Sequence, residues 1–136
     1  MKKILLLIMF LIPFKVVAMS ASSMVAVDLD NDYVYYDVNK DDKRLIASIT
    51  KIMTAIVTIE NIDIDKEITV GEEVLKAYGS AIYINVGEKI TIRDLLYGLI
   101  MRSGNDAAVV LAKNVAGSME GFAHLMNELA SNVGMK

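Results

Sequence analysis

The segment that most constrains the fold is SITKIMTAIVTIE, residues 48–60, because apolar side chains would surround most of it as a helix. The apolar positions are Ile49, Ile52, Met53, Ile56, Val57 and Ile59. A helix that is apolar nearly all round is typically buried in a protein core. We therefore expect a buried helix here.

Residues 24–38 predict a β-hairpin. MVAVDLD and YVYYDV are rich in β-branched and aromatic residues, and DLDND between them is typical of a turn. The aspartates of this turn also fit the opening of a calcium-binding loop. However, Tyr33 stands where that loop needs glycine, and Asn39 stands where it needs glutamate. The pattern favours the hairpin turn.

The C-terminal half predicts three helices, at about residues 92–101, 106–116 and 119–132. Thr91 and Asp94 resemble a capping box at the start of the first helix. Gly117 and Ser118 are suited to end the second helix and to begin the third. Residues 67–90 contain short elements that the pattern does not place.

These elements predict a fold of the α/β (α+β) class. Two strands alone are marginally stable in water, so the sheet is expected to be incomplete within this chain. For the same reason we expect marginal stability of the isolated chain.

The N-terminus resembles an export signal. Two lysines precede ILLLIMFLIPF, residues 4–14, and the small residues of VVAMSASS follow. We expect a signal peptide at about residues 1–21 and a mature portion at 22–136. The alternative is an uncleaved anchor, but a transmembrane helix needs about 20 apolar residues, and Pro13 interrupts this segment early.

Composition excludes several kinds of chemistry. The 136 residues include no cysteine, so thiol catalysis and disulfides are ruled out. The net charge of -3, with scattered Lys and Arg, gives no reason to expect nucleic acid as a partner. His124 is the single histidine, and its place within an expected helix favours a surface position over a Ser-His-Asp triad.

Ser48 and Lys51 form a Ser-x-x-Lys motif at the start of the expected buried helix. Side chains at i and i+3 lie on one face of a helix, so the two can meet. A serine hydroxyl becomes a nucleophile when a neighbouring base removes its proton, and burial and the helix N-terminus both disfavour the lysine ammonium. The alternative is a helix-capping serine beside a solvated lysine.

Ser103 and Asn105 belong to SGN, residues 103–105, in a break between two expected helices. This triplet also suits a simple helix stop followed by a new cap. In a catalytic site, Ser103 can relay a proton to a leaving amine and Asn105 can hold a substrate amide. Asp106 is interpreted as a first-turn acid that complements the helix N-terminus.

SITK, SGN and their flanks together resemble a known family. ASITKIMTAIVTIE, VGEKITIRDLLYGLIMRSGNDAAVVLAKNVAGS and FAHLMNELASNVGMK closely resemble the low-molecular-mass penicillin-binding proteins, which are D-alanyl-D-alanine carboxypeptidases of the serine β-lactamase-like superfamily. The resemblance covers about residues 23–136. It implies a β-lactamase/DD-peptidase-like fold.

The resemblance also implies a function and its residues. Ser48 would form an acyl-enzyme, Lys51 would be its base, Ser103 would transfer a proton and Asn105 would contact the substrate. The implied substrate is a peptidoglycan stem peptide ending in D-Ala-D-Ala, cleaved outside the cytoplasmic membrane. β-Lactam antibiotics would acylate Ser48. No metal or organic cofactor is implied.

One family motif is absent, because the chain contains no Lys-Thr-Gly. We therefore expect residues 22–136 to be the N-terminal portion of such an enzyme, truncated before the Lys-Thr-Gly strand, with any membrane association supplied by the missing C-terminal region. Two alternatives are an inactive truncated product and a related acyl-serine enzyme such as a β-lactamase. The glycine of SGN favours the carboxypeptidases over class A β-lactamases, which typically carry aspartate there.

Overall fold

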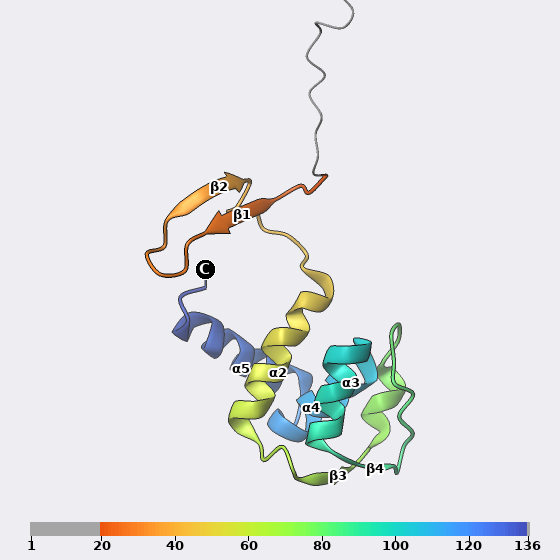
Figure 1. The fold of residues 1–136 in the computed structure, drawn as a ribbon. Helices are drawn as coiled ribbons and strands as arrows, with labels where there is room; N and C mark the ends of the chain where they lie inside the picture. The colour runs from red at the N-terminus through yellow and green to blue at the C-terminus, as the bar shows by residue number, and fades with distance from the viewer. Residues whose placement is uncertain (1–19, 136) are drawn as a thin grey trace, which may run out of the picture. The chain divides into compact units, whose positions relative to one another are not determined.

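The computed structural model describes residues 20–135, and the chain divides into two compact units between Arg44 and Leu45. A β-hairpin lies in the first unit, and helices with a second small sheet form the second unit (Figure 1). Most of the predicted signal peptide, residues 1–19, lies outside the described residues. Within residues 20–135, no helix has the length and apolar character needed to cross a bilayer.

The hairpin consists of β1 (Met24–Val27) and β2 (Val34–Val38), which pair antiparallel, as predicted. The Asp28 carboxylate organises its turn, because it accepts hydrogen bonds from the Asp30 N–H at 2.9 Å and from the Tyr35 hydroxyl at 3.2 Å. These bonds, the Asp30 N–H foremost, hold the pKa of Asp28 below its ordinary value. Asp28 is therefore engaged within the turn itself.

The second unit begins with a short 3-10 helix, η1 (Ala47–Ile49), which continues directly into α2 (Thr50–Asn61). Only one face of α2 is covered, by α3, α4 and α5. Thr54, Val57 and Thr58 are buried on that face.

The opposite face of α2 is exposed, so the prediction of a helix buried all round is wrong for that face. The exposed isoleucines are Ile49, Ile52, Ile56 and Ile59, with 41–63% of each residue accessible. They are spaced by three or four positions and therefore form one stripe. The reason is that the helices of this unit pack on one side of α2 only.

The remaining helices are α3 (Ile92–Arg102), α4 (Asn105–Ala116) and α5 (Met119–Asn132), close to the predicted ranges. Thr91 caps α3 as predicted, since the Asp94 N–H donates to Thr91 Oγ1 at 3.0 Å. The second bond differs from that of a capping box, because Asp94 Oδ2 accepts from the Thr91 hydroxyl at 2.6 Å and not from its backbone N–H.

The turn between α4 and α5 also has the predicted chemistry. Gly117 has a φ of +74°, in the left-handed region that glycine adopts without a Cβ clash. Ser118 caps α5 by accepting a hydrogen bond from the Gly121 N–H at 3.0 Å. The two helices can therefore pack against each other across a short connection.

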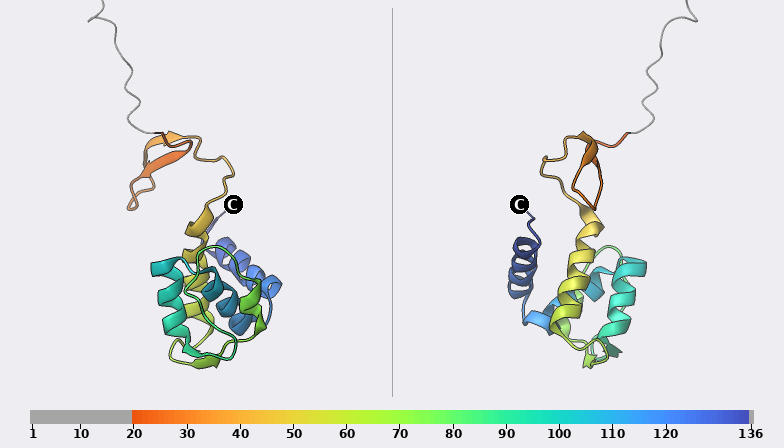
Figure 2. Two further views of the ribbon diagram at one scale, coloured as in Figure 1. Left: turned by 90° about the vertical axis from the view of Figure 1, so that its right-hand side faces the viewer. Right: turned by 60° about the vertical axis from the view of Figure 1, so that its left-hand side comes forward.

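A second small sheet joins the end of α2 to the start of α3. It pairs β3 (Glu67–Thr69) with β4 (Lys89–Thr91) in antiparallel register. Between them lies η2 (Glu72–Lys76), followed by a segment without regular secondary structure. This region was predicted only as short elements. The left view of Figure 2 shows this region against the helices of the second unit.

The core of the second unit centres on α3 and α4, whose inward side chains are fully buried. They include Ile92, Leu95, Leu99, Val110 and Leu111. Gly98 on α3 packs closely on Ile82 of the irregular segment, so that a Cβ at position 98 would force the Ile82 side chain to shift. This close packing brings the irregular segment against the junction of α3 and α4.

Candidate active site

Ser48 lies in η1, exposed at the surface, directly after Ala47, which has a φ of +47°. Neither η1 nor α2, both within the described part of the chain, has a side-chain hydrogen bond at its N-cap. Ser48 therefore does not act as a helix cap. Instead, its Oγ accepts a hydrogen bond of 2.9 Å from Ser103 Oγ.

Lys51 lies in the first turn of α2 and is half-buried. Its Nζ donates to the Ser103 carbonyl at 2.7 Å, to Ser103 Oγ at 2.9 Å and to Asn105 Oδ1 at 2.6 Å. An ammonium has three N–H donors, and three acceptors meet them here. Ser48 was expected to meet Lys51 directly, but the hydrogen bonds connect the two through Ser103.

Ser103 ends α3 in the left-handed conformation, with φ 54° and ψ 36°. This turn presents both its carbonyl and its hydroxyl to Lys51. Gly104 follows in a crowded place, since a Cβ there would lie 2.9 Å from Asp106 Oδ1 and 3.3 Å from Ile82 Cγ2. The glycine of SGN is therefore explained by packing.

Asn105 begins α4 and is held at both ends of its amide. Its Oδ1 accepts from Lys51, and its Nδ2 donates to the Tyr78 carbonyl at 2.7 Å. Its backbone N–H donates to the Ser80 carbonyl, also at 2.7 Å. The amide oxygen therefore points to the ammonium, in the orientation that the partners on both sides require.

Residues 78–84, which we call the strap, were not predicted as part of the site. Two backbone carbonyls of the strap, those of Tyr78 and Ser80, accept hydrogen bonds from Asn105. Two backbone amides of the strap donate hydrogen bonds to Asp106. Asp106 is only 4% exposed, and its carboxylate accepts from the Ile82 N–H at 3.1 Å and from the Ile84 N–H at 3.2 Å. The first-turn position of Asp106 was predicted, whereas its contact with a segment 22 to 24 positions earlier was not.

An open cavity of about 320 Å³ lies over the predicted residues. Ser48, Lys51 and Ser103 contribute its polar part. Its apolar wall comes from Ile49, Ile52, Leu99 and Ile100. The cavity therefore suits a ligand with a polar group that faces Ser48 and apolar atoms that contact the isoleucine and leucine side chains.

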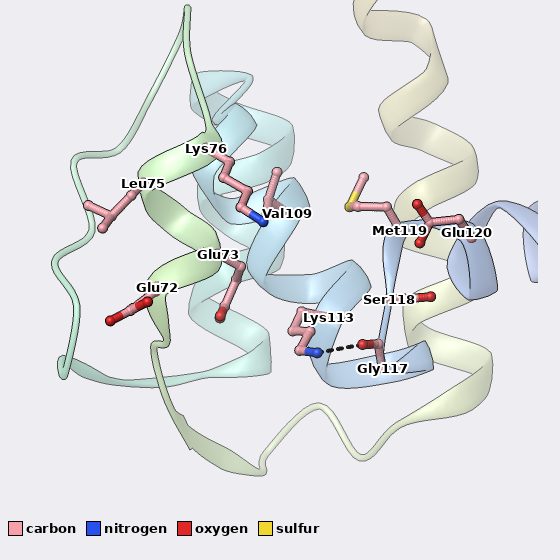
Figure 3. Close-up of a pocket in the computed structure, with 10 residues that line it drawn as sticks. All are labelled: Glu72, Glu73, Leu75, Lys76, Val109, Lys113, Gly117, Ser118, Met119 and Glu120. Atoms are coloured by element: carbon pink, nitrogen blue, oxygen red, sulfur yellow. Dashed lines mark hydrogen bonds between the residues drawn. The ribbon is translucent and has the colours of Figure 1, made fainter.

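A larger concavity, of about 700 Å³, lies between η2 and the turn from α4 to α5 (Figure 3). Charged side chains line much of it, and Lys113 Nζ donates to the Gly117 carbonyl at 2.6 Å at its edge. None of the four predicted site residues lines it. The candidate active site is therefore assigned from the side-chain chemistry around Ser48.

His124 lies on α5 with 74% of its side chain exposed, and its Nε2 is 3.5 Å from Glu128 Oε1. This agrees with the predicted surface position. Over residues 20–135, no group of three or more histidine and acidic side chains could hold a metal ion.

Several known proteins of similar sequence are D-alanyl-D-alanine carboxypeptidases. The model of the Peptidase S11 family, described as D-alanyl-D-alanine carboxypeptidase, matches residues 13–136. D-alanyl-D-alanine carboxypeptidase DacF of Bacillus subtilis is 35% identical over 124 residues, which cover 88% of this chain and 32% of the relative. DacC of Escherichia coli is 33% identical, with coverages of 87% and 32%. The chain thus spans about a third of the length of these relatives.

Solved structures show the same fold. D-alanyl-D-alanine carboxypeptidase DacD of Francisella tularensis superposes with a TM-score of 0.79 at 35% identity, over 87% of this chain and 30% of that one. Penicillin binding protein 6B of Escherichia coli gives a TM-score of 0.75 at 33% identity, over 83% of this chain and 39% of that one. The fold class expected from the sequence, part of a DD-peptidase fold, is confirmed.

Proposed function

The chain belongs to the Peptidase S11 family, the D-alanyl-D-alanine carboxypeptidases, and from this premise we propose that Ser48 is the nucleophile of a serine-type peptidase. The proposed reaction removes the terminal D-alanine from peptidoglycan stem peptides. The observation that carries the proposal is the continuous path from Ser48 Oγ through Ser103 Oγ to Lys51 Nζ, with both steps at 2.9 Å.

In the first half of the reaction, Ser48 Oγ attacks the carbonyl carbon of the scissile peptide bond and forms a C–O bond. Its proton moves to Ser103 Oγ, and the Ser103 proton moves to Lys51 Nζ, which has first released one of its three ammonium protons to solvent. Both steps are within hydrogen-bond reach, and a hydroxyl can donate in either direction because it rotates. The C–N bond then breaks, and the proton returns along this path to the amine of the departing D-alanine.

In the second half, water attacks the ester carbonyl and gives its proton to the same path. The C–O bond to Ser48 breaks, Ser48 regains its proton, and the shortened peptide leaves with a new carboxylate. Asn105 is proposed to contact a substrate amide while its Oδ1 orients Lys51. β-Lactams are proposed to acylate Ser48 by the first half-reaction.

We also propose the place and extent of this activity. Residues 1–21 would direct export, and the enzyme would act on peptidoglycan at the outer face of the cytoplasmic membrane. Residues 22–136 would be the N-terminal portion of a transpeptidase-like domain. The 32% coverage of the relatives supports that extent.

The test is covalent labelling of the full chain with a fluorescent penicillin. Label is expected on the unaltered chain and on Ser131→Ala, a control on the exposed face of α5. No label is expected on Ser48→Ala. Label that persists on Ser48→Ala would exclude Ser48 as the nucleophile. An unaltered chain that is folded but unlabelled would support the inactive alternative for these 136 residues.

A further inference from the structure

Asp106 carries a buried carboxylate that the proposed reaction does not use. It accepts hydrogen bonds from the Ile82 and Ile84 amides of the strap and from its own neighbour, the Ala107 N–H, at 2.9–3.2 Å. A buried carboxylate is costly unless such donors satisfy it. A first-turn acid that only complemented a helix N-terminus would not need to bind a distant segment, so these contacts point to a second role.

The strap faces α4 with alternate residues. The carbonyls of Tyr78 and Ser80 accept from Asn105, and the amides of Ile82 and Ile84 donate to Asp106. The strap is not regularly extended, because Gly79 and Tyr83 have φ values of +92° and +63°, yet these four backbone groups all meet α4. Two consecutive residues of α4 therefore bind this one segment: Asn105 donates to it and Asp106 accepts from it.

The strap also determines which end of the Asn105 amide meets Lys51. The Tyr78 carbonyl can only accept, so it selects the amide nitrogen and leaves Oδ1 toward the ammonium. The reversed amide would set N–H groups against the Lys51 ammonium. Gly79, with a φ of +92°, lies between the two strap carbonyls, and a Cβ there would lie 3.0 Å from Asn105 Nδ2. The strap is thus fitted closely to Asn105.

We propose that Asp106 is a positioning residue for acylation of Ser48: it anchors the strap, and the strap orients Asn105 against Lys51. This inference rests on the function proposed above. Asp106 itself contacts neither Ser48 nor Lys51 through any hydrogen bond of the described residues. Its influence passes through Asn105.

The test compares Asp106→Asn with Asp94→Asn in the full chain. Asp94 is a matched control, because it is a first-turn acid of α3 that is exposed and outside the site. Asp106→Asn places amide hydrogens against the strap amides, so labelling by fluorescent penicillin, expressed per folded molecule, is expected to slow about 100-fold, as small misplacements of catalytic groups do. Asp94→Asn is expected to label at the unaltered rate.

A second variant separates anchoring from helix charge. Asp106→Glu keeps the first-turn charge but pushes the strap outward by one methylene. Slower labelling by this variant supports anchoring, and full recovery of the unaltered rate contradicts it. Thermal unfolding of each variant gives the folded fraction used to normalise the rates.

A double-mutant cycle with Asn105→Ala tests the route of the effect. If Asp106 acts through Asn105, then Asp106→Asn should slow labelling less than about twofold once Asn105 is alanine, because coupled residues are not additive. A purely structural role would slow labelling by the same factor whether residue 105 is asparagine or alanine. Equal slowing in the two proteins would therefore contradict the proposal.

Amide exchange of the Asn105 side chain, followed by NMR, tests the anchoring without any reaction. Asp106→Asn is expected to speed this exchange at least tenfold relative to Asp94→Asn. An unlabelled unaltered chain would refute the proposed function, whereas unchanged Asn105 exchange in Asp106→Asn would refute the positioning role.

Discussion

Lys51 donates a 2.6 Å hydrogen bond to Asn105 Oδ1 across 54 positions of sequence. This bond joins the first turn of α2 to the first residue of α4. The Ser103 carbonyl and hydroxyl complete the ring of acceptors around the ammonium. The same lysine thus closes the junction of three helices and lies one hydroxyl away from Ser48.

Lys51→Arg should separate these two roles. A guanidinium can still donate to Asn105 and Ser103, but it does not release its proton and so cannot act as a base. We expect a folded protein whose labelling by fluorescent penicillin is slower by about 10²- to 10⁴-fold, the range for loss of a general base. Circular dichroism checks the fold. Labelling at the unaltered rate would argue against Lys51 as the base.

Ser103 can be tested by two substitutions that differ only in backbone effect. Ser103→Gly and Ser103→Ala both remove the hydroxyl, so both should slow labelling by about 10²- to 10⁴-fold. Because residue 103 is left-handed, glycine should be more stable there than alanine by about 1 kcal/mol. Urea unfolding measures the difference. Equal stabilities, or unequal labelling rates, would contradict this account.

Gly104→Ala should destabilise the α3–α4 junction. The new methyl would press on Asp106 Oδ1 and Ile82 Cγ2, and overpacking of this kind costs about 1–3 kcal/mol of the free energy of unfolding, measured in urea. The control is Ser131→Ala on the exposed face of α5, which should change that free energy by less than about 0.5 kcal/mol. A Gly104→Ala variant as stable as the unaltered chain would show that the junction can relax.

The two faces of α2 should respond differently to substitution at neighbouring positions. Val57 is 1% exposed, and Val57→Ala should cost about 2 kcal/mol of the free energy of unfolding by leaving a cavity. Ile56 is 41% exposed, and Ile56→Gln should change that free energy by less than about 0.5 kcal/mol, as surface substitutions usually do. A large loss from Ile56→Gln would mean that its face is covered in solution.

The Asp28 turn should respond to acid. Its hydrogen bonds favour the carboxylate and lower its pKa from 3.8, so their contribution to hairpin order is fully present above 3.8 and is lost as pH falls through the lowered pKa. The carboxyl ¹³C shift of Asp28 should titrate below 3.8, and the Asp30 amide shift should follow the same midpoint. In Asp28→Asn that amide transition should vanish. A midpoint at or above 3.8 would contradict the turn geometry.

Local chemistry made most of the elements predictable. The caps at Thr91 and Ser118 and the left-handed Gly117 depend on residues within a few positions, and each has the predicted geometry. The four expected site residues also come together, although spacing alone left Ser48 open to interpretation as a cap. Only the paired motifs and their flanks favoured the catalytic interpretation.

Long-range contacts account for what the sequence did not reveal. The β3–β4 pair joins strands of three residues each, too short for a periodic pattern. The strap has no regular secondary structure, and Asn105 and Asp106 hold it through its backbone. Backbone contacts of this kind leave no signature in residue type, so the second role of Asp106 was hidden behind its helical position.

Because main-chain atoms hold the strap to α4, some of its side chains can be substituted without loss of those hydrogen bonds. Tyr78, Ser80 and Tyr83 are exposed, and the bonds that fix the strap at Tyr78 and Ser80 use main-chain carbonyls. Side chains at Tyr78 and Ser80 can be exchanged while these bonds to α4 remain the same, whereas the φ of +63° at Tyr83 restricts its replacements. Drift or a combinatorial library at Tyr78 and Ser80 would therefore change exposed side chains next to Asn105 without removing the main-chain bonds that hold it.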